Sequence, residues 1–239
     1  MNLINGLDSM QAVILAAGEG RRLRPLTEHV PKPMVRIAGK PILEYTIRAL
    51  PQEIDEVILV VGYKGEVVKE YFGDLFKGRT IRYVWQDAPK GPMHALALAK
   101  DFLYDDLFLA LYADDLYDPS DIANCMQTVP VILVKETAHP ERFGVCLVGE
   151  KGRLISIFEK HENPPSNLAL IGVHLLDKSI FDLPHSPMPN GELNLTKQIG
   201  VWAVERHIQV VRAHFWHPIG YPEDVEMAEK IVARFNKTT

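Results

Sequence analysis

The stretch Gln11–Met34, QAVILAAGEGRRLRPLTEHVPKPM, decides how the rest of the chain is interpreted. It opens with a short aliphatic run over 12–17 that stops abruptly at glycine, which is typical of a buried β-strand. Gly18 and Gly20 lack the β-carbons that would hinder a tight turn or the close approach of backbone to a phosphate. Basic side chains then accumulate at Arg21, Arg22, Arg24 and Lys32. A strand that runs into an arginine-rich glycine loop predicts a polyphosphate-binding site.

Two common phosphate-binding motifs do not fit this loop. A P-loop needs Gly-Lys-Ser/Thr after a four-residue spacer, and the Rossmann fingerprint needs a third glycine where this chain has Leu23. The string instead resembles the signature of the sugar-1-phosphate nucleotidyltransferases, roughly L-A-x-G-x-G-x-R-L-x-P-x-T followed by P-K-P. The matching residues are Leu15, Ala16, Gly18, Gly20, Arg22, Leu23, Pro25, Thr27, Pro31, Lys32 and Pro33. The alternative is a basic surface turn, which seldom produces a match of this length.

Length and composition limit the classes of protein to consider. The chain has 239 residues, 47% of them hydrophobic, and a formal net charge of −5. This suits one large α/β domain over 1–239 with a core of its own. No apolar run approaches the roughly 18 residues of a membrane span, so we expect no membrane partner. The negative net charge disfavours a nucleic-acid partner and makes the local basic loop more informative.

Cysteine usage and the first residues indicate an ordinary intracellular chain. Cys125 and Cys146 are not spaced like zinc ligands or a redox pair, so we interpret both as small core residues. The segment 1–10 lacks a basic region followed by an apolar one, the pattern of a secretory signal. We therefore expect a cytoplasmic location.

The hydrophobic pattern predicts an alternating first half. Expected strands cover 12–17, 56–61, 80–85 and 107–112, and expected helices cover 41–50, 66–72 and 93–103. This alternation predicts a parallel sheet with right-handed crossovers. After Pro130, strand-like runs with few helices between them cover 131–135, 143–148, 154–159 and 168–175, before an amphipathic helix over 223–236. They predict antiparallel or mixed additions to the sheet.

Together with the resemblance, this pattern implies an α/β fold of the nucleotide-diphospho-sugar transferase type. Its mixed sheet would be Rossmann-like, mostly parallel in the N-terminal half. We expect residues 1–129 to hold nucleotide and metal, and residues 130–239 to hold the sugar phosphate and a closing helix. The family's reaction is attack of a sugar-1-phosphate oxygen on the α-phosphate of a nucleoside triphosphate, with release of pyrophosphate. Such a reaction needs positioning and charge neutralisation.

The resemblance implies roles for residues of the opening loop. Arg22 would bind the leaving phosphates and Lys32 would lie near the α-phosphate. The nucleotide would be lined by Leu15, Ala16, Ala17, Gly18 and Gly20. Arg21 and Arg24 are expected to be solvated or steering charges.

Two further segments resemble the family's base-binding and metal-binding sites. Gln86, with Gly91 after it, would read the pyrimidine edge, although an isolated loop glutamine is usually just hydrated. Asp114 and Asp115 follow a predicted strand at its carboxyl end, where oxygen ligands suit Mg²⁺ bridging phosphates. Asp114 takes the metal role in the motif, and Asp115 is a second candidate. Paired turn aspartates are the alternative.

The second half contains segments that resemble the family's sugar site. The implied sugar-binding and phosphate-binding residues are Gly144, Glu159, Lys160, Asn167 and Gly172. An exposed Glu-Lys pair is the alternative for Glu159 and Lys160, and His161 replaces the proline that usually follows them.

Two positions depart from the family. Pro218 replaces an aspartate that serves as a second metal ligand, and Asn190 replaces an arginine. Asp115, or His217, would then complete the coordination, unless one aspartate and the triphosphate suffice. We expect a Mg²⁺-dependent transferase that uses UTP or dTTP and a sugar-1-phosphate and that forms a homo-oligomer. The alternatives are a weak or inactive nucleotide-sugar-binding regulator, and a transferase for a non-sugar phosphate such as phosphocholine.

Overall fold

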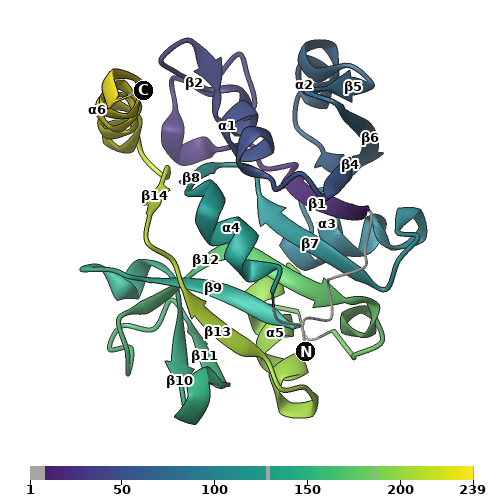
Figure 1. Ribbon diagram of the computed structural model, residues 1–239, viewed down its shortest axis with the longest axis vertical. Helices are drawn as coiled ribbons and strands as arrows, with labels where there is room; N and C mark the ends of the chain where they lie inside the picture. The colour runs from purple at the N-terminus through teal and green to yellow at the C-terminus, as the bar shows by residue number, and fades with distance from the viewer. Residues whose placement is uncertain (1–8, 128–129, 186, 239) are drawn as a thin grey trace.

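The computed structural model describes residues 9–127, 130–185 and 187–238. The segment 1–8, part of the argument against a signal sequence, lies outside the described residues. Most strands form one ten-stranded sheet in the order β11-β10-β12-β7-β1-β4-β6-β5, and β9 pairs with both β12 and β13 (Figure 1). The bounds are β1 Met10–Ala16, β4 Ile54–Val61, β5 Leu75–Phe76, β6 Arg79–Trp85, β7 Leu107–Tyr112, β9 Val131–Glu136, β10 Gly144–Val148, β11 Leu154–Glu159, β12 Leu168–Asp177 and β13 Gln209–Arg212.

The first half of the chain forms the parallel part of the sheet. Strands β7, β1, β4 and β6 are parallel neighbours, with Ile14 of β1 paired to Leu59 of β4 and to Leu111 of β7. Their aliphatic sequences fit strands that are covered on both faces, because buried parallel strands need no polar side. The predicted parallel half is therefore confirmed. Its helices are α1 Ile42–Ala49, α2 Gly65–Phe72, α3 Pro92–Leu98 and α4 Pro119–Cys125.

The second half adds antiparallel strands, as expected. β12 pairs antiparallel with β7 through Val173 and Leu111, and β10 pairs antiparallel with β11 and β12. The mixed sheet of the predicted fold class is thus confirmed. A separate two-stranded pair joins β8 Asp115–Tyr117 to β14 Trp216–Pro218, and a second joins β2 Arg36–Ile37 to β3 Lys40–Pro41. Neither pair was predicted from the sequence.

Helix α5, Leu195–Glu205, is another element that the sequence analysis missed. The Asn194 side chain accepts a hydrogen bond of 2.9 Å from the Lys197 amide and caps its first turn. Leu195, Ile199 and Trp202 recur at helical spacing and are all buried. The expected helix over 93–103 was also too long, because α3 ends at Leu98 and a short 3₁₀ turn follows.

Helices cover both faces of the sheet. α1, α2 and α4 pack on one face, whose buried cluster includes Cys125, and α3 and α5 pack on the other, whose cluster includes Cys146. Both cysteines are free and buried, as predicted. The final helix α6, Pro222–Thr238, lies beside β2 and contributes Val225, Ala228 and Val232 to a third cluster (Figure 1). None of the described helices is long and apolar enough to cross a bilayer.

The remaining described elements are short 3₁₀ turns. They are Arg21–Leu23, Lys32–Met34, Lys100–Phe102, Pro140–Arg142, Glu150–Gly152 and Lys178–Phe181. The first two belong to the glycine-arginine loop, which leaves the main sheet after β1 and leads to β2 of the separate β2–β3 pair. This excursion places the loop above the carboxyl end of β1, where ligands bind in open α/β sheets.

Candidate functional site

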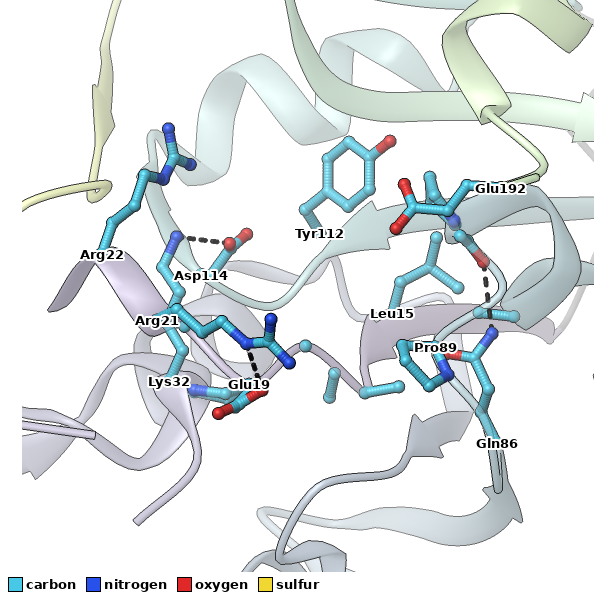
Figure 2. Close-up of a pocket in the computed structure, with 18 residues that line it drawn as sticks. Leu15, Glu19, Arg21, Arg22, Lys32, Gln86, Pro89, Tyr112, Asp114 and Glu192 are labelled. Atoms are coloured by element: carbon cyan, nitrogen blue, oxygen red, sulfur yellow. Dashed lines mark hydrogen bonds and ion pairs between the residues drawn. The ribbon is translucent and has the colours of Figure 1, made fainter. Parts of the chain in front are cut away.

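A cavity of about 550 Å³ opens at the carboxyl ends of β1, β6 and β7 (Figure 2). It brings together all of the residues that the sequence analysis assigned to nucleotide and catalysis. Those lining residues are Leu15, Ala16, Ala17, Gly18, Gly20, Arg22, Lys32, Gln86, Gly91 and Asp114. Tyr112 and Glu192 also line the cavity and were not predicted. One hollow thus contains a basic glycine loop, a carboxylate and a buried amide.

Gly20 fixes the shape of the loop. Its φ angle is +71°, in the left-handed region that favours glycine. A β-carbon at Gly20 would lie 2.6 Å from Cβ of Lys32, so the loop could not keep its contact with that side chain. The hydroxyl of Thr27 donates a hydrogen bond of 2.9 Å to the Gly20 carbonyl. The two halves of the family-like string are therefore packed against each other.

The basic residues of the loop differ in their partners. Arg21 and Arg24 donate hydrogen bonds of 2.7 and 2.6 Å to the carboxylate of Glu19. The hydrogen bond from Arg21 is the main cause of the lowered pKa of Glu19. Arg22 instead lies over the ring of Tyr221, with its Cζ atom 5.2 Å from the ring centre. Among the three arginines, Arg22 is the one whose charge is not paired with Glu19.

Lys32 and Asp114 face each other at one side of the cavity (Figure 2). The Lys32 Nζ donates to Oδ2 of Asp114 at 2.5 Å, and the two side chains are 12% and 32% exposed. Asp114 reaches this point from the turn between β7 and β8. The pair places an ammonium group, which can bind a phosphate, in contact with a carboxylate, which can bind a metal ion.

Asp115 lies in a different environment from Asp114. Its carboxylate accepts hydrogen bonds from the Trp216 indole at 2.9 Å and from the Ile219 amide at 3.0 Å. Burial, followed by the charge of Asp114, raises the pKa of Asp115. Pro218 is its direct neighbour in the β8–β14 pair. Asp115 does not line the cavity, and no group of three or more His, Cys, Asp or Glu residues forms a metal cluster among the described residues.

Gln86 is buried on the opposite side of the cavity. Its amide nitrogen is 3.2 Å from the Gly91 carbonyl and 2.9 Å from Nδ1 of His94. Burial lowers the pKa of His94, so its ring is neutral near pH 7 and Nδ1 can accept. Both amide hydrogens of Gln86 are then engaged within the protein. His94, which the sequence analysis passed over, therefore orients the carbonyl of Gln86.

Gly91 connects this side of the cavity to the second half of the chain. Its φ angle is +92°, and a β-carbon there would lie 2.5 Å from the Leu193 carbonyl. The Met93 amide donates to that same carbonyl at 2.9 Å. The close approach brings Glu192 to the cavity wall (Figure 2).

Three of the predicted sugar-site residues lie together behind Tyr112. The Tyr112 ring packs on Gly172, whose φ of +77° and lack of a side chain leave room for it. Oε2 of Glu159 is buried without a hydrogen-bond partner, and a β-carbon on Gly144 would lie 2.9 Å from it. Burial, followed by the charge of Glu159, raises the pKa of Tyr112. Thr196 of α5, also missed, packs on Gly144.

The other two predicted sugar-site residues are more exposed. Nζ of Lys160 is 4.0 Å from Oε1 of Glu159, and the lysine side chain is 67% exposed. Asn167 is exposed and its backbone carbonyl accepts from the Thr137 amide. The structure places Lys160 at the edge of the group formed by Gly144, Glu159 and Gly172. It does not bring the Asn167 side chain into that group.

Comparison with curated sequences identifies relatives of this chain. It is 37% identical to the bifunctional protein GlmU of Methanocaldococcus jannaschii over 224 residues, which cover 92% of this chain and 54% of the relative. It is 36% identical to the UTP–glucose-1-phosphate uridylyltransferase AglF of Haloferax volcanii, with 92% and 96% covered. The chain therefore spans about half the length of GlmU and nearly the whole of AglF.

Solved structures share the fold. A Bacillus anthracis protein provisionally assigned as a glucose-1-phosphate thymidylyltransferase, crystallised with sucrose, has a TM-score of 0.84 at 25% identity, with 93% of this chain and 95% of that chain covered. A UDP-glucose pyrophosphorylase in complex with UDP-glucose has a TM-score of 0.84 at 23% identity, with 95% and 99% covered, which supports the fold alone. Residues 11–234 match the nucleotidyl transferase family. With the glycine-arginine loop, the Lys32–Asp114 pair and Gln86 around one cavity, this chain belongs to the nucleotidyl transferase family.

Proposed function

We propose that the protein transfers a nucleotidyl group from UTP or dTTP to a sugar-1-phosphate, giving an NDP-sugar and pyrophosphate. The observation that carries this proposal is the shared cavity of Arg22, Lys32, Asp114 and Gln86. A triphosphate needs cations and backbone amides at one end of its site and a base-reading group at the other. These two kinds of group face each other across the cavity (Figure 2).

The reaction asks little covalent chemistry of the protein. An oxygen of the sugar phosphate forms a bond to the α-phosphorus, the bond from that phosphorus to the bridging oxygen breaks, and pyrophosphate leaves with the electron pair. Negative charge is concentrated between two anions, so fixed cations lower the barrier. Lys32 is largely buried and adjacent to the loop. It is suited to neutralise the α-phosphate once its ammonium group leaves Asp114 and binds that phosphate instead. Arg22 is suited to the departing phosphates.

The residues present fit a magnesium ion. Mg²⁺ is usually bound through one or two carboxylates together with substrate phosphates and water. Asp114 is a partly exposed carboxylate on the cavity wall and contacts Lys32, and so we propose that it holds the ion. Asp115 remains a second candidate, although its carboxylate already accepts two hydrogen bonds. When bound, the ion supplies positive charge to the phosphates.

The arrangement around Gln86 favours uracil or thymine. With both amide hydrogens engaged by Gly91 and His94, the side chain presents its carbonyl to a ligand. Uracil and thymine carry a ring N3–H that donates to such a carbonyl, whereas N3 of cytosine is an acceptor and would repel it. Discrimination against CTP follows.

The acceptor is proposed to be a sugar because of Glu159. A buried carboxylate oxygen without a partner is costly unless a ligand donates to it. Sugar hydroxyls are donors of that kind, while the trimethylammonium group of phosphocholine has no N–H or O–H to offer.

A panel of triphosphates, sugar-1-phosphates and phosphocholine, with Mg²⁺ present, tests the proposal through pyrophosphate release. We expect release with UTP or dTTP and a hexose-1-phosphate. The second candidate is a regulator that binds nucleotide sugars without turnover, and Pro218 and the engaged carboxylate of Asp115 favour it. Tight UDP-sugar binding by calorimetry, with no pyrophosphate from any combination, would establish that alternative. A cytoplasmic location and a homo-oligomer stay predictions.

A further inference from the structure

Two arginines from distant parts of the chain meet at one tyrosine. Cζ of Arg22 lies 5.2 Å from the centre of the Tyr221 ring, and Cζ of Arg142 lies 5.0 Å from the same centre. Arg22 belongs to the glycine-arginine loop, and Arg142 ends the 3₁₀ turn before β10. Tyr221 immediately precedes α6. A β-carbon on Gly220 would lie 3.9 Å from a terminal nitrogen of each arginine, so the two guanidinium groups converge on one point.

The aromatic contacts hold the guanidinium groups without using up their hydrogen-bonding edges. A guanidinium over an aromatic face is attracted by the ring, and its N–H groups stay free to bind oxygen. Arg142 also lies over Phe143, with Cζ 5.8 Å from that ring's centre. Phe143 in turn packs edge-on against Trp216 at 4.9 Å between ring centres. The Arg142 head group is therefore positioned in advance by two aromatic rings.

The charge of this pair has no carboxylate counterpart in the part of the chain that the structure describes. Among the described residues, neither Arg22 nor Arg142 forms an ion pair with a carboxylate. The carboxylate of Asp224 is close to Gly220, but its Oδ2 accepts from the Gly220 and Tyr221 amides at 2.8 and 2.9 Å. Two cations that converge without a carboxylate between them form a favourable place for an anion.

We propose that Arg142 is an anion-binding residue of the reaction, and that Arg22 and Arg142, set on Tyr221, bind one phosphoryl group between them. This inference rests on the proposed function. The pair joins the nucleotide half, through Arg22, to the sugar half, through Arg142, next to Gly144. Arg142 thus supplies a guanidinium group from the second half of the chain. The anion is either the leaving pyrophosphate or the phosphate of the sugar-1-phosphate.

Calorimetric titration with inorganic pyrophosphate and with glucose-1-phosphate, in the presence of Mg²⁺, separates the two sources without turnover. Arg142→Gln removes the charge, and a charge-assisted hydrogen bond of the usual strength predicts a loss of affinity of about 10-fold or more. Loss for pyrophosphate alone identifies the leaving group, and loss for glucose-1-phosphate alone identifies the acceptor. Affinities for both anions within twofold of the control would overturn the proposal.

A control variant and two variants of Tyr221 separate loss of this site from the general effect of removing a positive charge. Arg212→Gln serves as the control because it removes the charge of another exposed arginine, one that pairs with Glu136 on β9. Tyr221→Leu removes the aromatic platform and is expected to weaken the same anion as Arg142→Gln, whereas Tyr221→Phe keeps the ring face and restores the affinity. If both Tyr221 variants bind equally well, the platform is not part of the site. If no combination in the activity panel releases pyrophosphate but Arg142→Gln still weakens the binding of pyrophosphate, the proposed reaction is wrong and the anion site is supported.

Discussion

Nζ of Lys32 lies 2.5 Å from Oδ2 of Asp114, so two side chains to which the proposed reaction assigns separate partners neutralise each other's charge. A metal-bound triphosphate offers each member a new partner at once: a phosphate for the lysine and a cation for the carboxylate. A free triphosphate offers only the first and would leave a partly buried carboxylate next to phosphate oxygens. We therefore expect the proposed reaction to use the magnesium complex of the nucleotide.

Removal of Asp114 tests that argument. Asp114→Ala and Arg22→Ala should each lower kcat by at least about 100-fold, the usual loss when a charge-stabilising group is deleted. Circular dichroism and thermal melting should show folded proteins, because both side chains are at least partly exposed. Arg24→Ala is a matched control, since Arg24 is exposed and pairs with Glu19. A near-normal rate in either cavity variant would mean that the site is misassigned.

Replacement of His94 tests whether this residue orients Gln86 for recognition of the nucleotide base. His94→Ala frees one amide hydrogen of Gln86, and the side chain can then rotate to present either end. We expect the preference for UTP over CTP, measured as the ratio of kcat/KM values, to fall by about 10-fold, the effect of one misplaced hydrogen bond. In His94→Asn, which keeps an acceptor near the amide, this ratio should fall less. An unchanged ratio in His94→Ala would show that His94 does not orient Gln86.

The two loop glycines should respond differently to alanine. Gly20→Ala places a β-carbon 2.6 Å from Cβ of Lys32 in a left-handed conformation, which should cost about 1 to 3 kcal/mol of unfolding free energy. Gly18→Ala meets nothing within 4 Å and should leave stability unchanged. It should still raise KM for the triphosphate if the backbone approaches a phosphate there. Denaturant unfolding and steady-state kinetics measure the two effects, and equal stability of the two variants would contradict the prediction.

His174 should make the protein sensitive to acid. It is 1% exposed in the middle of β12, and burial lowers its pKa to about 3. The unfolded chain binds a proton below about pH 6.5 and the folded chain does not, so stability is fully present above pH 6.5 and falls as the pH is lowered towards 3. The slope is about 1.4 kcal/mol per pH unit.

A variant isolates the contribution of this residue. In His174→Leu the loss of unfolding free energy that His174 causes between pH 6.5 and 5.5 should disappear, because leucine has no group that binds a proton. Urea unfolding at both pH values gives the difference. Parallel losses in the two proteins would show that another group is responsible.

The sequence predicted those parts of the candidate site whose residues are contiguous in the chain or directly follow a strand. The strand, the glycines and the basic residues of 11–34 are adjacent in the chain, and Gln86 and Asp114 each follow a strand whose carboxyl end faces the same edge. The tertiary contacts of single side chains could not be obtained this way. Asp114 and Asp115 are consecutive, yet one lines the cavity and the other binds Trp216, about a hundred positions away.

Other features lacked a visible signal for a different reason. His94 is a helix residue whose importance depends on the rotamer of Gln86, and Arg142 becomes distinctive only when Tyr221 is beside it. Helix α5 had a signal, namely Asn194 before an apolar pattern with Leu195 and Ile199, and the interpretation of that region as mainly strands hid it. Local rules thus predicted elements and motifs, while the pairing of distant side chains required the fold.

The place of β12 in the sheet has a consequence for how the protein is made. The strand lies between β7 of the first half and β9 and β10 of the second, although it is synthesised after all of them. Until residue 177 has left the ribosome, β7 is an uncovered sheet edge of Leu, Phe and Ala residues, the kind of edge that recruits other chains. The proposed division near residue 130 into a nucleotide half and a sugar-phosphate half therefore does not coincide with two folding units, and we expect a fragment ending there to aggregate.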